Sequence, residues 1–406
     1  MIDFEPNEDQ RLIKDSVASF AKATLGPRAR EHEKARGVSE EVRKLAHEMG
    51  LGLVTLPESA GGSGLGLTTA VLLEEELGSA DAGAAFGLGG PGAFGALVLE
   101  LAPEQAGELL ADFGGADGHA RFGAVAFSEA RSLKERAGFS TVAVAEGEGY
   151  VITGKKCYVG NAALAQRFVV VAQVDPDKGW AGLGAFVVER DNPGVTIGAR
   201  HDTLGLDAAS FGEVSFKGAA VPASARLGAS LGGDDFTRAL LRFFAKQSLL
   251  VAARATGLAR FAYELALEHC DNRKAFGKPI GHFQAVAFTL ADRLMDVDAS
   301  RWLIWRAACA WDQKQPEKEA LRATAQASAT ALEAAMRTAD DCVGLHGGSG
   351  FIRDLIAEKL MRDAKQLALC ALTPEQLDQI ASAIELGAPL DPALCLPTPE
   401  TQAVFI

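Results

Sequence analysis

The spacing of apolar residues along the chain changes twice, which divides the sequence into three segments. Up to about residue 120, apolar residues recur about every three to four positions, as on one face of an amphipathic helix. Asn7 and Ser39 are expected N-caps, because such side chains accept hydrogen bonds from the first helical turn. Helices are expected at residues 8–26, 40–49, 68–77 and 103–113, with Glu74, Glu75 and Glu76 on a solvated face.

Between about residues 121 and 230 the pattern becomes that of strands. Runs such as FGAVAFS, YVITGKKCYV and FVVVAQV, separated by glycines and an Asn-Pro pair, predict short strands. No helical pattern separates these runs, so an antiparallel sandwich or barrel is expected and a doubly wound sheet is not. From about residue 233 helical spacing returns in longer runs, and Pro316 is placed to open one of those helices.

The pattern therefore predicts an α+β chain in which a central β domain lies between two helical domains. A chain of 406 residues is too long for one ordinary core, which also favours several domains. The expected domains are residues 1–120 (helical), 121–232 (β sandwich or barrel), 233–390 (helical bundle) and 391–406 (extended tail).

Composition narrows the class of partner. The formal net charge of -13 argues against a nucleic-acid or anionic membrane surface, although a local basic patch can still hold a phosphate. No signal-peptide pattern and no stretch of about 18 apolar residues is present, so an intracellular, cytoplasmic location is expected. The six cysteines form no CxxC pair and no zinc-ligand spacing, so no metal site is expected.

Four stretches resemble the acyl-CoA dehydrogenase family, in the right order and over almost the whole chain. Two of them, DNRKAFGKPIGHFQAVAFTLADRL (271–294) and CVGLHGGSGFIRDLIAEKLMRDAK (342–365), resemble its C-terminal signatures. The others are LPESAGGSGLGLTTAVLLEEELG near residue 60 and GYVITGKKCYVGN near residue 155. The resemblance implies a helical N-terminal domain, a central antiparallel β domain, a C-terminal four-helix bundle, and FAD bound between subunits of a tetramer.

One group of cofactor-binding residues follows from the C-terminal signatures. The resemblance implies that Arg273 serves the FAD pyrophosphate, that Phe276 packs near the cofactor and that Gln284 reaches the adenosine half. A guanidinium suits this role because its fork donates two hydrogen bonds to phosphate oxygens, although a lone arginine is more often a surface ion-pair residue. Gly347 and Gly348 are expected to form a turn whose backbone N–H groups can approach a ligand closely, and the resemblance implies that they do so across the subunit boundary.

A second group comes from the β domain and the C-terminal end. Phe127 and Ser128 match the strand that donates to the flavin ring edge, and Tyr158 stands where the family usually has a tryptophan. Gly160 stands where the family often has a serine or threonine at the flavin, and Thr373 matches the threonine of the family's Tyr-Glu-Gly-Thr run.

The pattern breaks at the catalytic base. The family removes an α-proton from an acyl thioester with a glutamate while a hydride leaves the β-carbon for flavin N5. The glutamate usually follows Arg-Asp-Ala-Lys by six residues, which is Ala371 here, and in a minority of members it lies at the position of Gln247. Neither side chain can take a proton. Glu375 is a candidate for a relocated base, although it is better explained as a helix-start residue after Thr-Pro, and Glu129 is a weaker candidate.

Three interpretations remain open. The chain is a dehydrogenase with a relocated base, or a flavoenzyme with altered chemistry, or a non-catalytic subunit that pairs with a competent relative. The partners expected from the resemblance are an acyl-CoA or an acyl-carrier-protein thioester, and an electron-transfer flavoprotein or another acceptor. A homodimer or homotetramer is expected, and a heteromer remains an alternative. Nucleic acid and a membrane span are not expected.

Overall fold

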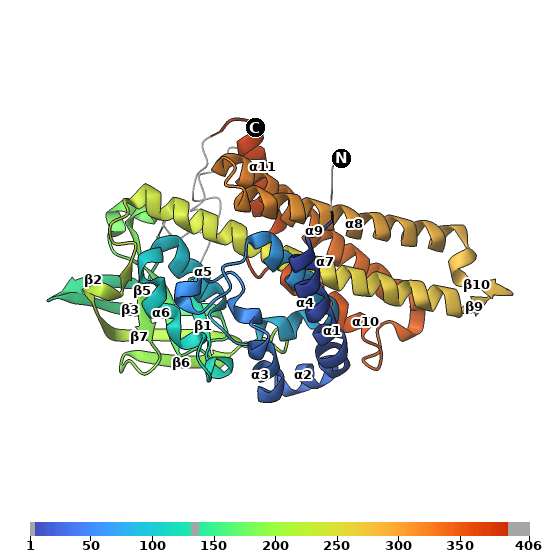
Figure 1. The fold of residues 1–406 in the computed structure, drawn as a ribbon, viewed down its shortest axis with the longest axis horizontal. Coiled ribbons are helices and arrows are strands. Elements are labelled where there is room, and N and C mark those ends of the chain that lie inside the picture. The colour runs from blue at the N-terminus through green and yellow to red at the C-terminus, as the bar shows by residue number, and fades with distance from the viewer. Residues whose placement is uncertain (1–4, 131–137, 389–406) are drawn as a thin grey trace.

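A computed structural model describes residues 5–130 and 138–388 of the chain (Figure 1). The N-terminal helices are α1 (Glu8–Phe20), α2 (Ala29–Ala35), α3 (Glu40–Glu48), α4 (Leu67–Phe86), α5 (Gly92–Leu101) and α6 (Ala106–Leu110). The expected caps are present, because the Asn7 side chain accepts from the backbone N–H of Gln10 and Ser39 accepts from Val42. The helix expected at residues 103–113 is instead a series of short turns around α6.

The middle of the chain forms a single sheet. Its strands are β1 (Gly123–Ala126), β2 (Val142–Glu146), β3 (Gly149–Gly160), β4 (Arg167–Gln173), β5 (Leu183–Glu189), β6 (Val195–Arg200), β7 (Phe211–Pro222) and β8 (Arg226–Leu227). The order is β6-β7-β3-β2-β4-β5-β8, and β1 pairs with β4. The pairs are antiparallel except for β1–β4 and the single pair between β2 and β4, which are parallel. The predicted β domain is therefore confirmed, as one mostly antiparallel sheet that also contains these two parallel pairings.

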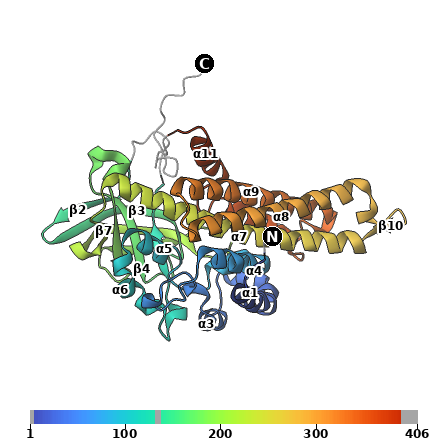
Figure 2. The ribbon, with the colours of Figure 1, turned by 45° about the horizontal axis from the view of Figure 1, so that its top comes forward.

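The C-terminal part is a bundle of long helices that runs along the longest axis of the molecule (Figures 1 and 2). Its members are α7 (Gly233–Asn272), α8 (Gln284–Asp312), α9 (Glu317–Leu345), α10 (Ala357–Leu367) and α11 (Pro374–Glu385). A small hairpin of β9 (Lys274–Ala275) and β10 (Lys278–Pro279) joins α7 to α8. Both views place this hairpin at one end of the molecule and the large sheet at the other. The expected tail at 391–406 lies outside the described residues.

Two glycines allow α4 and α7 to pack closely. A Cβ added to Gly78 would lie 2.1 Å from the carbonyl oxygen of Arg254, and one added to Gly257 would lie 1.9 Å from that of Glu75. Both distances are too short for any side chain, so only glycine permits this approach. This close crossing holds the backbone of Arg254 against α4, and so fixes the position from which its side chain extends. Among the described residues, no helix is long and apolar enough to cross a membrane.

The prediction that the glutamates of α4 lie on a solvated face was wrong. Glu75 and Glu76 are buried, and both bond Arg260 of α7, with Oε1 of Glu75 3.1 Å and Oε2 of Glu76 2.7 Å from it. Glu74 is partly buried and accepts two hydrogen bonds from Arg254. The run is instead the acidic side of a set of interhelical ion pairs, because arginines distant in sequence face it.

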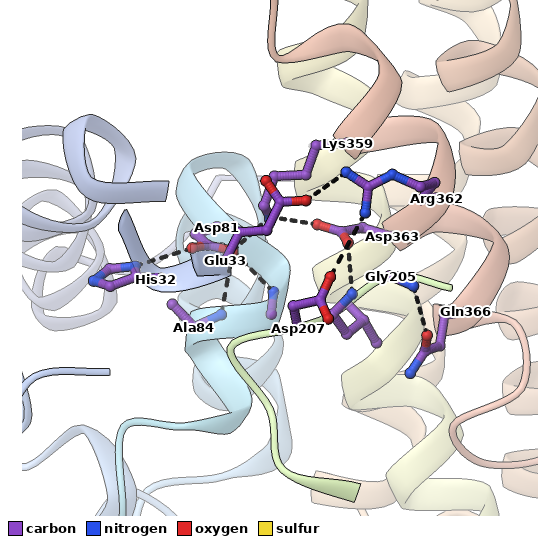
Figure 3. Close-up of polar contacts among 12 residues, drawn as sticks. His32, Glu33, Asp81, Ala84, Gly205, Asp207, Lys359, Arg362, Asp363 and Gln366 are labelled. Carbon is purple, nitrogen blue, oxygen red and sulfur yellow. Dashed lines mark hydrogen bonds and ion pairs between the residues drawn. The ribbon is translucent and has the colours of Figure 1, made fainter. Parts of the chain in front are cut away.

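The three parts of the chain meet at a buried set of charges, which we call the three-domain junction (Figure 3). Its centre is Asp81, at a non-helical kink within α4. Nζ of Lys359 on α10 donates to Asp81 Oδ1 at 3.0 Å and to Asp363 Oδ2 at 2.6 Å, and His32 Nδ1 lies 3.0 Å from Asp81 Oδ2. The backbone N–H of Leu206, in the loop between β6 and β7, donates to Asp363 Oδ1 at 2.6 Å.

A ring of two arginines and two glutamates extends the junction. Arg362 donates to Glu358 at 2.7 Å and to Glu33 at 2.5 Å, and Arg30 pairs with the same two carboxylates at 2.6 Å each. Burial opposes ionisation of Glu33 and Glu358, but the two guanidinium groups outweigh it and lower both pKa values. The ring joins α2 to α10.

Candidate functional site

The segment after β1 carries the predicted flavin-edge residues and is held by a buried lysine. Nζ of Lys156, which is fully buried, donates to the carbonyl oxygen of Phe127 at 2.8 Å and pairs with Glu129 Oε1 at 2.9 Å. The ring of Phe127 packs against Phe244 of α7, with centroids 4.8 Å apart. Ser128 is exposed, and its carbonyl accepts from Cys157 on the neighbouring β3 at 2.9 Å.

The hydrogen bonds and the ion pair of Glu129 account for its carboxylate by a structural role. Its two oxygens accept from the backbone N–H groups of Ser140 at 2.7 Å and Thr141 at 3.0 Å, in addition to the Lys156 pair. Burial alone would raise the pKa of Glu129, but the Lys156 charge and these hydrogen bonds lower it overall. A carboxylate with a lowered pKa and every oxygen bonded is a poor proton acceptor.

Tyr158 and Gly160 lie at the irregular end of β3. Tyr158 has φ +56° beside a register shift between β3 and β7, and its side chain is 63% exposed. A positive φ is unfavourable for a tyrosine, so the bulge presents this ring to the surface at a conformational cost. The only ring contact that the structure gives for Tyr158 within the described residues is with His201, at 5.0 Å.

The residues from the C-terminal signatures gather around the hairpin. Phe276 is at the hairpin turn with φ +49° and a side chain that is 97% exposed. Arg273 and Gln284 are exposed on either side of the turn, and Arg273 has no ion-pair partner within residues 5–130 and 138–388. Gly347 and Gly348 follow α9, and a Cβ at either would meet no atom within 4 Å. The stacked rings of His269 and His346, 4.2 Å apart, place the glycine turn beside this end of α7.

The predicted cofactor residues thus form two separate groups. The hairpin half-site consists of Arg273, Phe276, Gln284, Gly347 and Gly348, and the sheet half-site consists of Phe127, Ser128, Tyr158, Gly160 and Thr373. Ser248, near the sheet half-site, and Arg273 are 25 residues apart in sequence, with α7 spanning nearly all of that interval. At about 1.5 Å per residue this is roughly 37 Å, farther than one dinucleotide reaches. Figures 1 and 2 show the same separation between hairpin and sheet.

The residues next to the two usual base positions, Ser248 and Leu372, are in contact. Ser248, next to Gln247 on α7, is buried, and its Oγ accepts from the backbone N–H of Leu372 at 3.1 Å while donating to Phe244 at 2.9 Å. Leu372 follows Ala371 in the turn between α10 and α11. The fold therefore brings the neighbours of Gln247 and Ala371 into contact, and neither position supplies a carboxylate.

Glu375 lies in the first turn of α11 and is exposed. Thr373 is the N-cap, and its side chain accepts from Gln376 while Gln376 bonds back in a capping box. The pKa of Glu375 is lowered by a hydrogen bond from its own backbone N–H and by Thr373. An acidic residue there stabilises the helix terminus, which accounts for Glu375 without a catalytic role.

The sequence reasoning missed two residues at the sheet half-site, Arg254 and Phe86. The guanidinium of Arg254 lies over the Phe86 ring, with Cζ 3.9 Å from the ring centroid. The Phe86 carbonyl accepts from Asn161, which follows Gly160, at 2.8 Å. The motif spacing gave no signal for this arrangement, because it depends on the α4–α7 crossing.

The features of both half-sites fit FAD. The exposed, strained Phe276 and Tyr158 can cover flat aromatic rings, and the free Arg273 and the open glycines suit a pyrophosphate. In the part of the chain that the structure describes, no group of three His, Cys, Asp or Glu side chains is arranged to hold a metal ion.

Comparison with known proteins agrees along the whole chain. Residues 7–117, 124–219 and 236–380 match the families described as the N-terminal, middle and C-terminal domains of acyl-CoA dehydrogenase. Cyclohex-1-ene-1-carbonyl-CoA dehydrogenase of Geobacter metallireducens is 34% identical over 359 residues, which cover 88% of this chain and 93% of that protein.

Solved structures share the fold. Butyryl-CoA dehydrogenase from Megasphaera elsdenii is 26% identical and superposes with a TM-score of 0.86, covering 95% of this chain and 100% of that one. A structure described as PigA with FAD and proline is 25% identical, with a TM-score of 0.84 over 95% of this chain and 99% of that one. The three matched domains, the fold and the two half-sites lead to one conclusion: the chain belongs to the acyl-CoA dehydrogenase family, whose cofactor is FAD.

Proposed function

We propose that this chain binds FAD at a site shared between two chains and acts on acyl thioesters of CoA or of an acyl carrier protein, without a glutamate at either usual base position. One observation carries the proposal. The fold joins the neighbours of Gln247 and Ala371 through the Ser248–Leu372 hydrogen bond, as a working site requires, yet these positions hold an amide and a methyl group.

The proposed reaction is α,β-dehydrogenation. Bound FAD supplies the acceptor for the β-hydride. The chain's own residues hold the flavin edge through Phe127 and Ser128 and keep that segment fixed through Lys156. A missing base at the α-carbon removes a contribution of about 10²- to 10⁴-fold, so simple acyl-CoA substrates are expected to reduce the flavin slowly. A substrate with a more acidic α-proton, or a different flavin reaction, would depend less on that base.

Self-association is part of the proposal, because neither half-site is complete alone. An exposed apolar stripe on α8 supports it. Phe288, Met295 and Trp302 recur at intervals of seven residues, and all three are exposed in the single chain. A heptad stripe of this kind is typical of helix–helix association. A homodimer or homotetramer would place the hairpin half-site of one copy against the sheet half-site of another, and an electron-transfer flavoprotein is the proposed electron acceptor.

The separation of the half-sites also favours a second candidate function, that of a non-catalytic partner subunit. A chain that lacks the base can still lend Arg273 and Phe276 to the cofactor site of a competent relative. In such a heteromer the relative would supply the glutamate, and this chain would supply the other half of the FAD site.

The first experiment is an absorbance spectrum of the purified chain, with its oligomeric state, followed by anaerobic addition of acyl-CoAs. A bound flavin that is bleached by an acyl-CoA would support dehydrogenation with a different base. A bound flavin that persists would support altered chemistry or a carrier-bound substrate. A colourless monomer that binds FAD only with a homologous chain would favour the partner-subunit function over the first proposal.

A further inference from the structure

Arg254 has an unfilled hydrogen-bond donor in the interior. Its side chain is only 7% exposed, and Nε and Nη2 donate to the same oxygen of Glu74, Oε2, at 2.8 and 2.5 Å. The remaining nitrogen, Nη1, is buried and has no hydrogen-bond partner among the described residues. A charged N–H group without an acceptor is costly in the interior, so the position favours a ligand oxygen.

This donor lies beside the site already described. Arg254 is seven residues, or about two turns, beyond Gln247 on α7, so both side chains leave the same face of the helix. On its other side the guanidinium covers the ring of Phe86, whose carbonyl is bonded by Asn161 of the sheet half-site. Burial raises the pKa of the Cys370 thiol to about 12, and the nearby charge of Arg254 acts in the opposite direction. Cys370 immediately precedes Ala371.

The opposite charges of Arg254 and Glu74 restrict which kind of ligand oxygen can bind at Nη1. Glu74 already neutralises Arg254, so a carboxylate at Nη1 would add a second negative charge close to Glu74 in a partly buried site. The free-energy cost of holding two negative charges close together exceeds the gain from the hydrogen bond unless another cation is present. Among the described residues, the contacts of Arg254 include no other cation. A neutral carbonyl or hydroxyl oxygen accepts the hydrogen bond without that penalty.

We propose that Arg254 determines substrate specificity, with Nη1 donating to a neutral oxygen, keto or hydroxyl, that the acyl chain carries beyond its thioester carbonyl. The proposal rests on the proposed function, because it places the acyl chain between α7 and Phe86. It gives the substrate class as oxygenated acyl thioesters. Arg254 contacts the acyl chain and not the reacting carbons.

The test compares five-carbon acyl-CoAs that differ only in their distal group. Pentanoyl-, 4-oxopentanoyl-, 5-hydroxypentanoyl- and glutaryl-CoA are titrated anaerobically into the FAD-loaded protein, and the Kd of each is read from the change in flavin absorbance. The 4-oxo or 5-hydroxy compound is expected to bind about ten-fold more tightly than pentanoyl-CoA, the usual gain for a hydrogen bond to a charged group.

Three variants test the residue. Arg254→Lys keeps a charge for Glu74 but replaces the guanidinium fork with a single nitrogen, so the ratio of the Kd of pentanoyl-CoA to that of the oxygenated compound should fall from about ten to about one. The double variant Arg254→Met with Glu74→Gln removes both charges and every donor at position 254, and it should give the same result if the lysine variant does not fold. Arg260→Lys is the matched control, because Arg260 lies on the same helix and pairs with α4 glutamates away from the site.

Equal binding of all compounds by the wild-type protein would overturn the inference, as would a preference that survives in Arg254→Lys. Tightest binding of glutaryl-CoA would overturn the assignment of a neutral oxygen. A flavin that responds to none of the compounds would exclude CoA thioesters of this length as ligands and, with them, overturn this inference. The response to pentanoyl-CoA therefore separates failure of acyl-CoA binding from failure of the specificity.

Discussion

The three-domain junction and the cofactor half-sites use charged and aromatic groups in opposite ways. At the junction Lys359 and Arg362 are held by acidic partners from within the same chain, and they join helices that lie far apart in sequence. At the half-sites Arg273 has no ion-pair partner among the described residues, and Phe276 and Tyr158 are exposed at unfavourable backbone angles. Groups satisfied within one chain stabilise its fold, and groups left unsatisfied indicate where a ligand or a second chain binds.

The largest effect is expected at the junction. Lys359→Met should lower the free energy of unfolding by roughly 3–5 kcal/mol, because it leaves Asp81 and Asp363 buried without their shared cation. Urea unfolding of the FAD-loaded protein measures this. Lys365→Met, at an exposed position of the same helix, is the control and should change little. A loss below about 1 kcal/mol for Lys359→Met would mean that the junction does not carry the domain contacts.

The second-largest effect is an expected gain in the rate of flavin reduction when a base is restored at position 371. Ala371→Glu should raise the rate of flavin reduction by an acyl-CoA by about 10²-fold, because it restores a general base where the fold already brings the two base positions together. Stopped-flow absorbance measures the rate, and Ala371→Gln is the isosteric control without a base. If both variants reduce the flavin equally slowly, the acyl group does not bind in the family's orientation.

A smaller effect is expected at the hairpin half-site. Arg273→Gln should weaken FAD binding by about ten-fold, because a guanidinium that has no protein partner is available to the pyrophosphate. The comparison is Lys274→Gln, the exposed neighbour, which should leave FAD affinity within about two-fold of wild type. Equal losses in the two variants would mean that only the general positive charge of the hairpin matters.

The smallest effect is expected for Glu375→Gln. The rate of flavin reduction should change by less than about two-fold, because Glu375 is exposed at a capped helix start and its pKa is lowered. The same stopped-flow assay applies, with FAD content measured first. A complete loss of reduction with FAD still bound would instead identify Glu375 as the relocated base.

The sequence predicted the features that depend on neighbours in the chain. The caps at Asn7 and Ser39 and the period of the strands are local, and the structure confirms them. The burial of Glu75 and Glu76 was missed because it depends on Arg260, about 185 residues later. A helical pattern alone does not show whether an acidic face meets water or arginines.

The arrangement of the candidate cofactor site also depends on residues distant in sequence, which local patterns do not reveal. The motifs predicted a set of cofactor residues, but their spacing could not show that Arg273 and Phe127 fall into separate half-sites. That result depends on α7 remaining one uninterrupted helix for 40 residues. Arg254 was also missed, since its environment is created by the glycines at the α4–α7 crossing and by the end of α4, where Phe86 lies.

Because α7 is one continuous helix, its length sets the distance between the two half-sites of each chain. Every residue added or removed between Ser248 and Arg273 would move the hairpin by about 1.5 Å and rotate it by about 100° around the helix axis. A change of seven residues would nearly restore the direction of the hairpin but shift it by about 10 Å, away from the surface it is proposed to meet. The length of this helix is therefore under a constraint that no single contact reveals, because it sets the distance between paired sites in different chains.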